Sequence, residues 1–141
     1  MRGTHEWGSV TLDASRPPIR RVTVEGTITE AAVRAYLADA ARLLDTGAEH
    51  VLVYDLLRMN ALGAVHRRIQ AEWIVEHRLA IRKLCRGAGF AMCSAVQRGA
   101  LTALLWLTPL PFGHAIFATV AEAESWALQQ MKHSARPKRW G

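Results

Sequence analysis

The polar side chains best placed to do chemistry follow two predicted strands. One group comes after a short apolar run that ends at Asp55, and the other comes after a glycine-rich run that ends at Cys93. Open α/β sheets bind ligands at the carboxyl ends of their strands. We therefore predict a polar interaction rim made of Asp55, Arg58, Asn60, Ser94, Gln97 and Arg98. The alternative is that Asp55 and Arg98 only fix loops, as ion-pair or capping residues.

None of the candidate nucleophiles has a visible catalytic partner. Ser94 lacks the flanking glycines of a nucleophile elbow, and its simplest role is to cap the helix that follows it. Cys93 is expected to pack inside as a small apolar residue. Cys85, which lies beside Lys83 and Arg86, would have a stabilised thiolate if it were exposed. We predict that the protein is not an enzyme.

Metal and phosphate motifs are also missing from the sequence. Glu72, Glu76 and His77 lie on neighbouring turns of a predicted helix, but their spacing does not match a zinc motif, and ion pairs explain them more simply. The glycine-rich segment 86–89 precedes a strand instead of joining a strand to a helix, so it does not match a phosphate-binding loop. We predict no metal and no cofactor.

A second distinctive feature is the segment 100–112, which is apolar almost all the way round a helix. A surface helix normally keeps one polar face. This segment is therefore either buried against the sheet, covered by a second subunit, or the lining of an apolar pocket that takes a lipid-like tail. The predicted apolar interface or pocket consists of Trp73, Leu101, Leu104, Leu105, Trp106, Leu110 and Phe112.

Hydrophobic periodicity predicts the elements that position these residues. The predicted order is β-β-α-β-α-β-α-β-α, which indicates an α/β domain with a mixed sheet of about five strands and four packed helices. The strands are expected at 5–14, 19–25, 50–56, 87–93 and 115–117. The helices are expected between Thr29 and Gly47, at 64–84, at 94–107, and from a capping box at Thr119 to about Lys132.

Length and charge suggest one domain followed by a basic tail. The chain has 141 residues and a net charge of +6, and residues 61–141 contribute most of the positive excess. We expect a domain at 1–132 and a basic tail at 133–141, either solvated or in contact with an anionic membrane surface; nucleic acid is not the expected partner. With two cysteines and no signal-like start, a cytoplasmic location is expected.

Several segments together carry a family resemblance. They are Val24–Thr29, Val51–Asp55, Glu72–Trp73 with His77–Arg78, Arg98–Thr102, Leu105–Pro109, and Glu122–Ala123 with Trp126. Over nearly its whole length the chain resembles the SpoIIAA-like family of the STAS-like superfamily. The resemblance implies a STAS-like domain related to bacterial anti-sigma-factor antagonists and, more loosely, to lipid-carrying Sec14-type modules.

The resemblance also implies a regulatory role, with one departure. Antagonists of this kind are switched by phosphorylation of a serine just after the strand that is predicted to end here at Asp55, but residues 56–60 contain no hydroxyl side chain. A phosphoserine switch is therefore not expected at that position. We predict a non-catalytic regulatory or scaffolding domain that acts through protein–protein interaction and self-association as a homo-oligomer. The alternative is a binder or carrier of a hydrophobic, lipid-like small molecule near a membrane surface.

Overall fold

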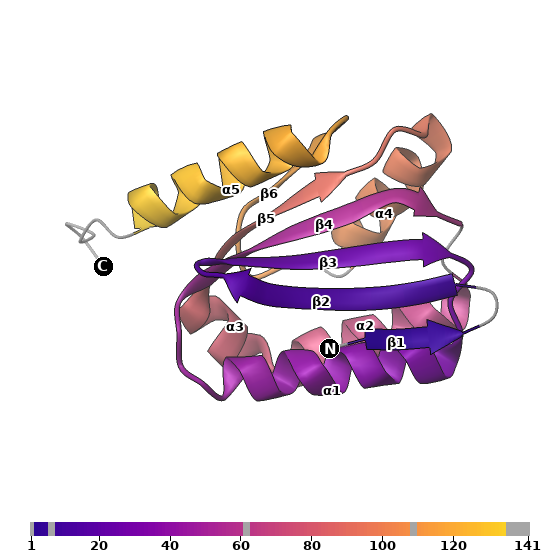
Figure 1. The fold of residues 1–141 in the computed structure, drawn as a ribbon, viewed down its shortest axis with the longest axis horizontal. Coiled ribbons are helices and arrows are strands. Elements are labelled where there is room, and N and C mark those ends of the chain that lie inside the picture. Colours follow the sequence, from indigo (N-terminus) through magenta and orange to yellow (C-terminus); the bar gives the residue numbers. More distant parts are fainter. Residues whose placement is uncertain (1, 6–7, 61–62, 108–109, 135–141) are drawn as a thin grey trace.

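The computed structural model describes residues 2–5, 8–60, 63–107 and 110–134. Within these ranges the strands form one six-stranded sheet in chain order, and they are β1 (Arg2–His5), β2 (Gly8–Arg16), β3 (Ile19–Gly26), β4 (His50–Met59), β5 (Cys85–Ala91) and β6 (His114–Phe117). Strands β1, β2 and β3 pair antiparallel, whereas β3 to β6 pair parallel. The predicted mixed sheet and hairpin are confirmed, and β1 is an additional strand at the edge (Figure 1).

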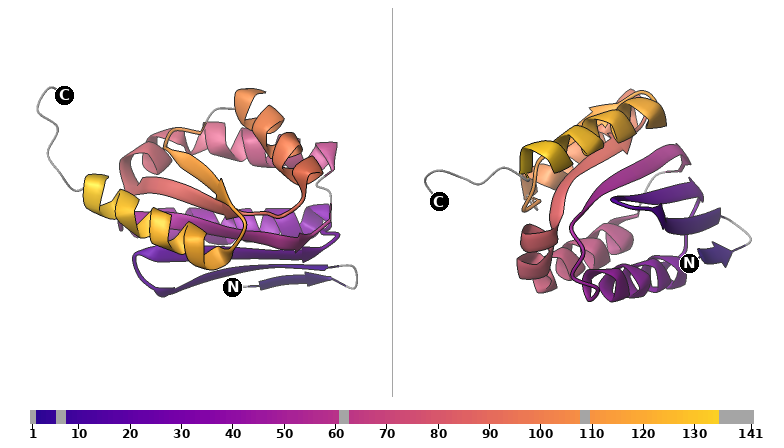
Figure 2. Two further views of the ribbon diagram at one scale, coloured as in Figure 1. Left: turned by 90° about the horizontal axis from the view of Figure 1, so that it is seen from above. Right: turned by 60° about the vertical axis from the view of Figure 1, so that its left-hand side comes forward.

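Helices cover both faces of the sheet, as parallel strands require. They are α1 (Glu30–Leu44), α2 (Ala64–Glu76), α3 (Arg78–Leu84), α4 (Ala95–Leu107) and α5 (Val120–Ser134). Helix α5 lies on one face, and α1, α2 and α3 lie on the other (Figure 2). Within the described ranges no helix combines the length and the apolar character needed to cross a membrane.

Strand β4 has apolar side chains on both faces of the sheet. Val51 and Val53 are fully buried and pack with Ala123 and Ala127 of α5. The alternate residues Leu52, Tyr54 and Leu56 point to the opposite face, where they belong to the larger apolar core that contains residues of α1. A continuous apolar run therefore describes a strand with both sides buried.

The predicted helix boundaries at Thr29 and Thr119 are confirmed. The Thr29 hydroxyl accepts a hydrogen bond from the Ala32 backbone N–H at 3.2 Å, and Gly47 adopts a positive φ of 75° after α1. The Thr119 hydroxyl accepts from the Glu122 backbone N–H, also at 3.2 Å. Both helices begin with a side chain that replaces a missing backbone acceptor in the first turn.

The single long helix expected at 64–84 is instead two helices that meet at His77. The backbone N–H of His77 donates to the Trp73 carbonyl at 3.0 Å, and the two rings stack with centroids 4.2 Å apart. Because α3 takes a different direction from α2, its residues Ile81 and Leu84 are buried beside Leu44 of α1 and near the start of β5. The apolar periodicity of the sequence is continuous over 64–84, but the burial of Ile81 and Leu84 favours a break at His77 over one straight helix.

Strand β4 also continues beyond the predicted end. It runs to Met59, because its last residues pair with β3 after a register shift, with Arg58 opposite Glu25 and Met59 opposite Gly26. Strand β5 ends earlier than expected, at Ala91. Helix α5 continues to Ser134, and the tail residues 135–141 lie outside the described part of the chain.

Candidate ligand pocket

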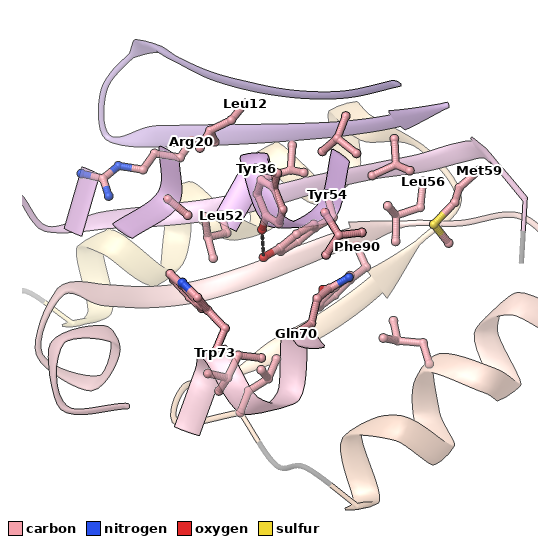
Figure 3. Close-up of a pocket in the computed structure, with 18 of the residues that line it drawn as sticks. Leu12, Arg20, Tyr36, Leu52, Tyr54, Leu56, Met59, Gln70, Trp73 and Phe90 are labelled. Atoms are coloured by element: carbon pink, nitrogen blue, oxygen red, sulfur yellow. Dashed lines mark hydrogen bonds between the residues drawn. The ribbon is translucent and has the colours of Figure 1, made fainter. Parts of the chain in front are cut away.

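A pocket of about 250 Å³ lies between the sheet and the helices α1, α2 and α4. Its floor is formed by the sheet residues that face away from α5, and Figure 3 shows Leu52, Tyr54 and Phe90 among them. Helix α2 closes the opposite side with Trp73 and Gln70 (Figure 3). Concave, mainly apolar spaces with a few polar groups are the usual form of small-molecule sites.

Five of the residues predicted for an apolar interface or pocket line this space, namely Trp73, Leu101, Leu105, Leu110 and Phe112. The side chains of Leu104 and Trp106, also predicted, lie outside the described part of the structure. Leu105 is buried, whereas Val96 on the first turn of α4 is 82% exposed and lies at the edge of the pocket. Helix α4 is therefore not simply buried against the sheet, and its described inward side chains contribute to the pocket.

An aromatic group containing two phenol hydroxyls occupies the middle of the pocket. Tyr54 stacks on Phe90 with ring centroids 4.8 Å apart, and its hydroxyl lies 3.2 Å from that of Tyr36 (Figure 3). Burial raises the pKa of Tyr36, and it raises the pKa of Tyr54 further. Both phenols are therefore neutral at ordinary pH. One hydrogen bond between two hydroxyls uses only one of their two protons, so the second can be donated to a ligand.

The end of the pocket nearest the start of β4 carries Arg20, His50 and Cys85. Arg20 is only 8% exposed, and burial lowers the pKa of its guanidinium. The His50 ring nitrogen Nδ1 lies 3.1 Å from the Ala48 carbonyl. Burial lowers the pKa of His50 to about 4, and the charge of Arg20 adds to this effect. His50 is therefore neutral at pH 7, which leaves Nε2 as an acceptor if Nδ1 carries the proton.

The expectation that Cys93 packs inside is wrong, and the exposure on which a stabilised thiolate at Cys85 depended is not found. Cys85 is buried at the start of β5, and burial raises the pKa of its thiol to about 12, so the thiolate is disfavoured. Cys93 is exposed, because β5 ends at Ala91 and the alternation that would have turned Cys93 inward does not extend that far. Reactivity at Cys85 is thus not supported.

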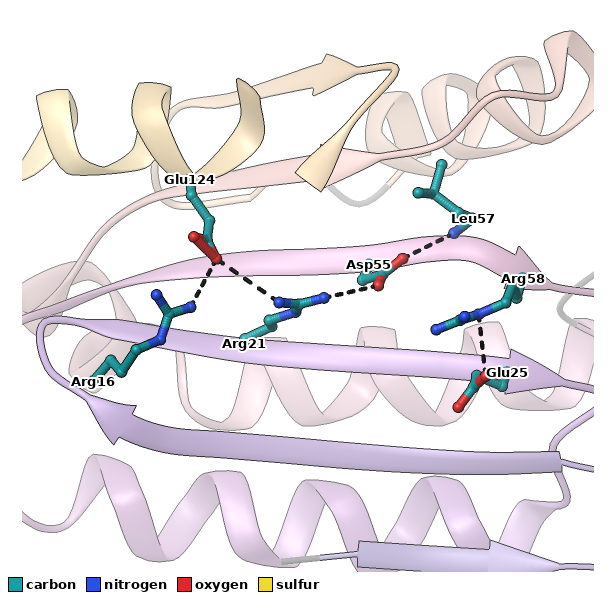
Figure 4. A network of polar contacts seen from close by, with 7 residues as sticks. All are labelled: Arg16, Arg21, Glu25, Asp55, Leu57, Arg58 and Glu124. Carbon is teal, nitrogen blue, oxygen red and sulfur yellow. Dashed lines mark hydrogen bonds and ion pairs between the residues drawn. The ribbon is translucent and has the colours of Figure 1, made fainter. Parts of the chain in front are cut away.

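The predicted rim residues do not gather at one site. Asp55 is buried on the α5 face, where it accepts hydrogen bonds from Arg21 at 3.1 Å and from the Leu57 backbone N–H at 3.3 Å (Figure 4). Arg58 forms a surface ion pair with Glu25 at 3.1 Å. Neither side chain lines the pocket, because successive residues of a strand point to opposite faces.

The other four rim residues mostly bond to neighbouring segments. Asn60 donates to the Thr27 hydroxyl at 2.7 Å, and Ser94 accepts from the Gln97 backbone N–H at 3.3 Å. Arg98 donates twice to the Met92 carbonyl, at 3.0 and 2.7 Å. Gln97 donates to the Met59 carbonyl at 2.5 Å, and it is the member of the predicted rim that lines the pocket. For Asp55 and Arg98 the contacts agree with the loop-fixing alternative.

Sequence reasoning missed the polar groups of the pocket. Arg20, Tyr36, His50 and Tyr54 were not among the predicted site residues, yet all four line it. A signal for Arg20 was present, since it shares the inward face of β3 with Val22 and a charged residue at such a position is rare. Among the described residues, no three His, Cys, Asp or Glu side chains gather as metal ligands would.

Comparison with known proteins gives structural matches only. No protein-family model and no curated protein matches the chain. An uncharacterized protein from the DUF3478 family with a SpoIIAA-like fold, from Shewanella loihica PV-4, is 15% identical, with a TM-score of 0.60 over 90% of this chain and 98% of that one. An anti-sigma factor antagonist from Mycobacterium paratuberculosis is 18% identical, with a TM-score of 0.55 over 84% of this chain and 92% of that one. The chain therefore has a SpoIIAA-like fold, as its sequence resemblance implied.

Proposed function

We propose that this chain is a non-catalytic regulatory domain that binds a hydrophobic small molecule in the pocket between the sheet and α4. The observation that carries the proposal is the pocket itself, about 250 Å³ in volume and lined mainly by aliphatic and aromatic side chains. This volume lies just below the range of roughly 300–1,000 Å³ typical of small-molecule sites. The regulatory part rests on the likeness in fold to an anti-sigma factor antagonist.

The contacts of the candidate catalytic groups support a binding role over catalysis. Asp55 is paired with Arg21 on the far face of the sheet, and Ser94 caps the first turn of α4. The buried thiol of Cys85 has a raised pKa. Among the polar groups that line the pocket, the phenol hydroxyls of Tyr36 and Tyr54 are suited to orienting a ligand by hydrogen bonding.

Two alanines of α4 provide a matched test. Ala100 and Ala103 are both exposed, but Ala100 lines the pocket and Ala103 does not. A tryptophan at position 100 is expected to occupy the pocket, whereas a tryptophan at position 103 should remain in solvent. Because both sites are on the surface of one helix, neither substitution should prevent folding.

The experiment measures the binding of 1-decanol to the purified protein by isothermal titration calorimetry, and native mass spectrometry detects the bound alcohol. We expect binding to the wild type and to Ala103→Trp, and at least about tenfold weaker binding to Ala100→Trp, which corresponds to roughly 1.4 kcal/mol. If the wild type does not bind the alcohol, or if all three proteins bind it equally, the pocket is not the site.

Partner binding through α4, with self-association, is the second candidate function. Val96 is 82% exposed at the start of this helix, and Thr102 and Ala103 are exposed further along it. Leu105 is buried and is therefore a poor residue with which to test the surface. Sedimentation equilibrium of the wild type and Val96→Glu is the appropriate measurement. A wild type that is monomeric at micromolar concentration would contradict self-association.

A location in the reducing cytoplasm, with peripheral membrane contact through the basic tail, belongs to the same proposal. The tail charges include Arg136, Lys138 and Arg139, and each basic residue near an anionic surface contributes about 1 kcal/mol. Cosedimentation with vesicles containing phosphatidylserine, compared between the full chain and a chain ending at Ser134, tests it. Equal binding of the two chains would contradict a role for the tail.

A further inference from the structure

Arg20 is a largely buried cation that has no hydrogen-bond or ion-pair partner among the described residues. The residue as a whole is 8% exposed and lines the pocket, and its guanidinium nitrogens are not among the fully buried atoms, so they remain accessible to a ligand. Burying an ionised group without a counter-charge is costly, and proteins normally pair such a group or bind a ligand with it. By contrast, the neighbouring and more exposed Arg21, on the opposite face of β3, is paired with Asp55 at 3.1 Å.

The charge of the pocket lining is one-sided. Two arginines, Arg20 and Arg67, are among the described residues that line it, and no aspartate or glutamate is among them. His50, next to Arg20, is neutral at pH 7 because burial lowers its pKa to about 4. Among the described lining residues, the Arg20 end of the pocket thus offers one guanidinium and no competing carboxylate.

Apolar surface extends from Arg20 along the strands. Arg20 pairs with Leu52 in the sheet register, and Leu52, Tyr54 and Leu56 follow one another on the same face of β4. The four residues of rise from Leu52 to Leu56 correspond to about 13 Å, at the ~3.3 Å per residue of a strand. Arg20 lies toward one end of this apolar surface and Met59 lies toward the other, and Tyr36 and Tyr54 lie between them (Figure 3).

We propose that the pocket binds an amphipathic anion whose carboxylate or phosphate group pairs with Arg20 and whose hydrocarbon chain lies along Leu52, Tyr54 and Leu56 toward α4. This inference rests on the proposed function, since it names the class of molecule that the pocket takes. The guanidinium presents its donors in a planar fork that matches either oxyanion. The hydroxyl proton that the Tyr36–Tyr54 hydrogen bond does not use can be donated to a polar atom along the hydrocarbon chain of the ligand.

Ligands with one tail and different heads test the charge directly. The probes are decanoate, decyl phosphate, 1-decanol and decyltrimethylammonium, titrated by calorimetry below their micelle-forming concentrations. The proteins are the wild type, Arg20→Met, Arg20→Lys and the control Arg58→Met, which removes a surface arginine outside the pocket. Circular dichroism verifies that each variant is folded.

In the wild type we expect an anion to bind roughly 10- to 100-fold more tightly than 1-decanol, the range expected for a hydrogen-bonded charge pair. Arg20→Met should lose this preference but still bind the alcohol, Arg20→Lys should retain part of the preference, and Arg58→Met should match the wild type. Whichever of decanoate and decyl phosphate binds more tightly identifies the head group.

The inference and the proposed function fail differently. Equal affinity of the wild type for the anions and for 1-decanol, or tighter binding of the cationic probe, would overturn the role of Arg20 and leave the apolar pocket standing. An anion preference that survives in Arg20→Met would have the same meaning. Absence of binding by every probe would overturn the proposed function, and the inference with it.

Discussion

Gly89 lies where α5 approaches β5 too closely to admit a side chain. A Cβ atom added at Gly89 would lie 2.8 Å from the Ala123 carbonyl oxygen and 3.2 Å from the Ala123 Cα. Both obstacles are backbone atoms, so no rotation of a side chain relieves the contact. Gly89→Ala should therefore force α5 away from the sheet and loosen the packing of Ala123 and Ala127 on Val51 and Val53.

The expected cost is that of overpacking a core, about 1–3 kcal/mol. At about 2.1 cal/mol/K of unfolding entropy per residue, this lowers the Tm of the chain by roughly 3–10 °C. Gly99→Ala is the control, because Gly99 lies inside α4 with no other element within 4 Å, and alanine should stabilise the helix by about 0.5–1 kcal/mol. Urea unfolding and thermal melts followed by circular dichroism measure both. A Gly89→Ala variant as stable as the wild type would show that α5 does not pack as described.

Three further predictions concern buried polar groups. Arg20→Met keeps the apolar stem and removes the unpaired charge, so it should raise the free energy of unfolding of the ligand-free protein by about 1–3 kcal/mol in urea titrations; a loss of stability would contradict the unpaired state. The pKa of His50 is lowered from 6.5 to about 4 in the folded chain, so the unfolded chain binds the proton first as the pH falls. Stability should therefore decrease from about pH 6.5 toward pH 4, and His50→Phe should show a smaller decrease in the same urea series; parallel profiles would refute this. Asp55→Asn weakens the buried pair with Arg21 and should lower the free energy of unfolding by about 1–3 kcal/mol. Arg58→Ala, which removes a surface ion pair, should change it by less than about 0.5 kcal/mol. Equal effects of the two substitutions would argue against the buried network.

The fold was accessible from the sequence because its signals are local. The apolar stripe and the Thr29 cap specify α1, and the continuous apolar run at 51–54 specifies a strand with two covered faces. Once strands and helices alternate, only a few connections remain possible. The sequence pattern did not predict the break at His77, since that break depends on where Ile81 and Leu84 find apolar neighbours.

The polar rim shows why the site could not be predicted in the same way. The prediction grouped Asp55 with residues 94–98 because all follow strands. In the folded chain Asp55 faces α5, whereas Tyr54 and Leu56, one residue away on either side, face the pocket. The face that a strand residue occupies depends on which helices cover each side of the sheet.

By itself, the sequence determined the kind of domain, through the periods of its apolar residues and the caps of its helices. Only the tertiary structure decided that Arg20, Tyr36 and Tyr54, from three separate elements, line one pocket. Sequence periodicity records which residues avoid water, and it carries no information about which distant residues meet. That no described residue pairs with Arg20 could be seen only after the other described side chains had been placed around it.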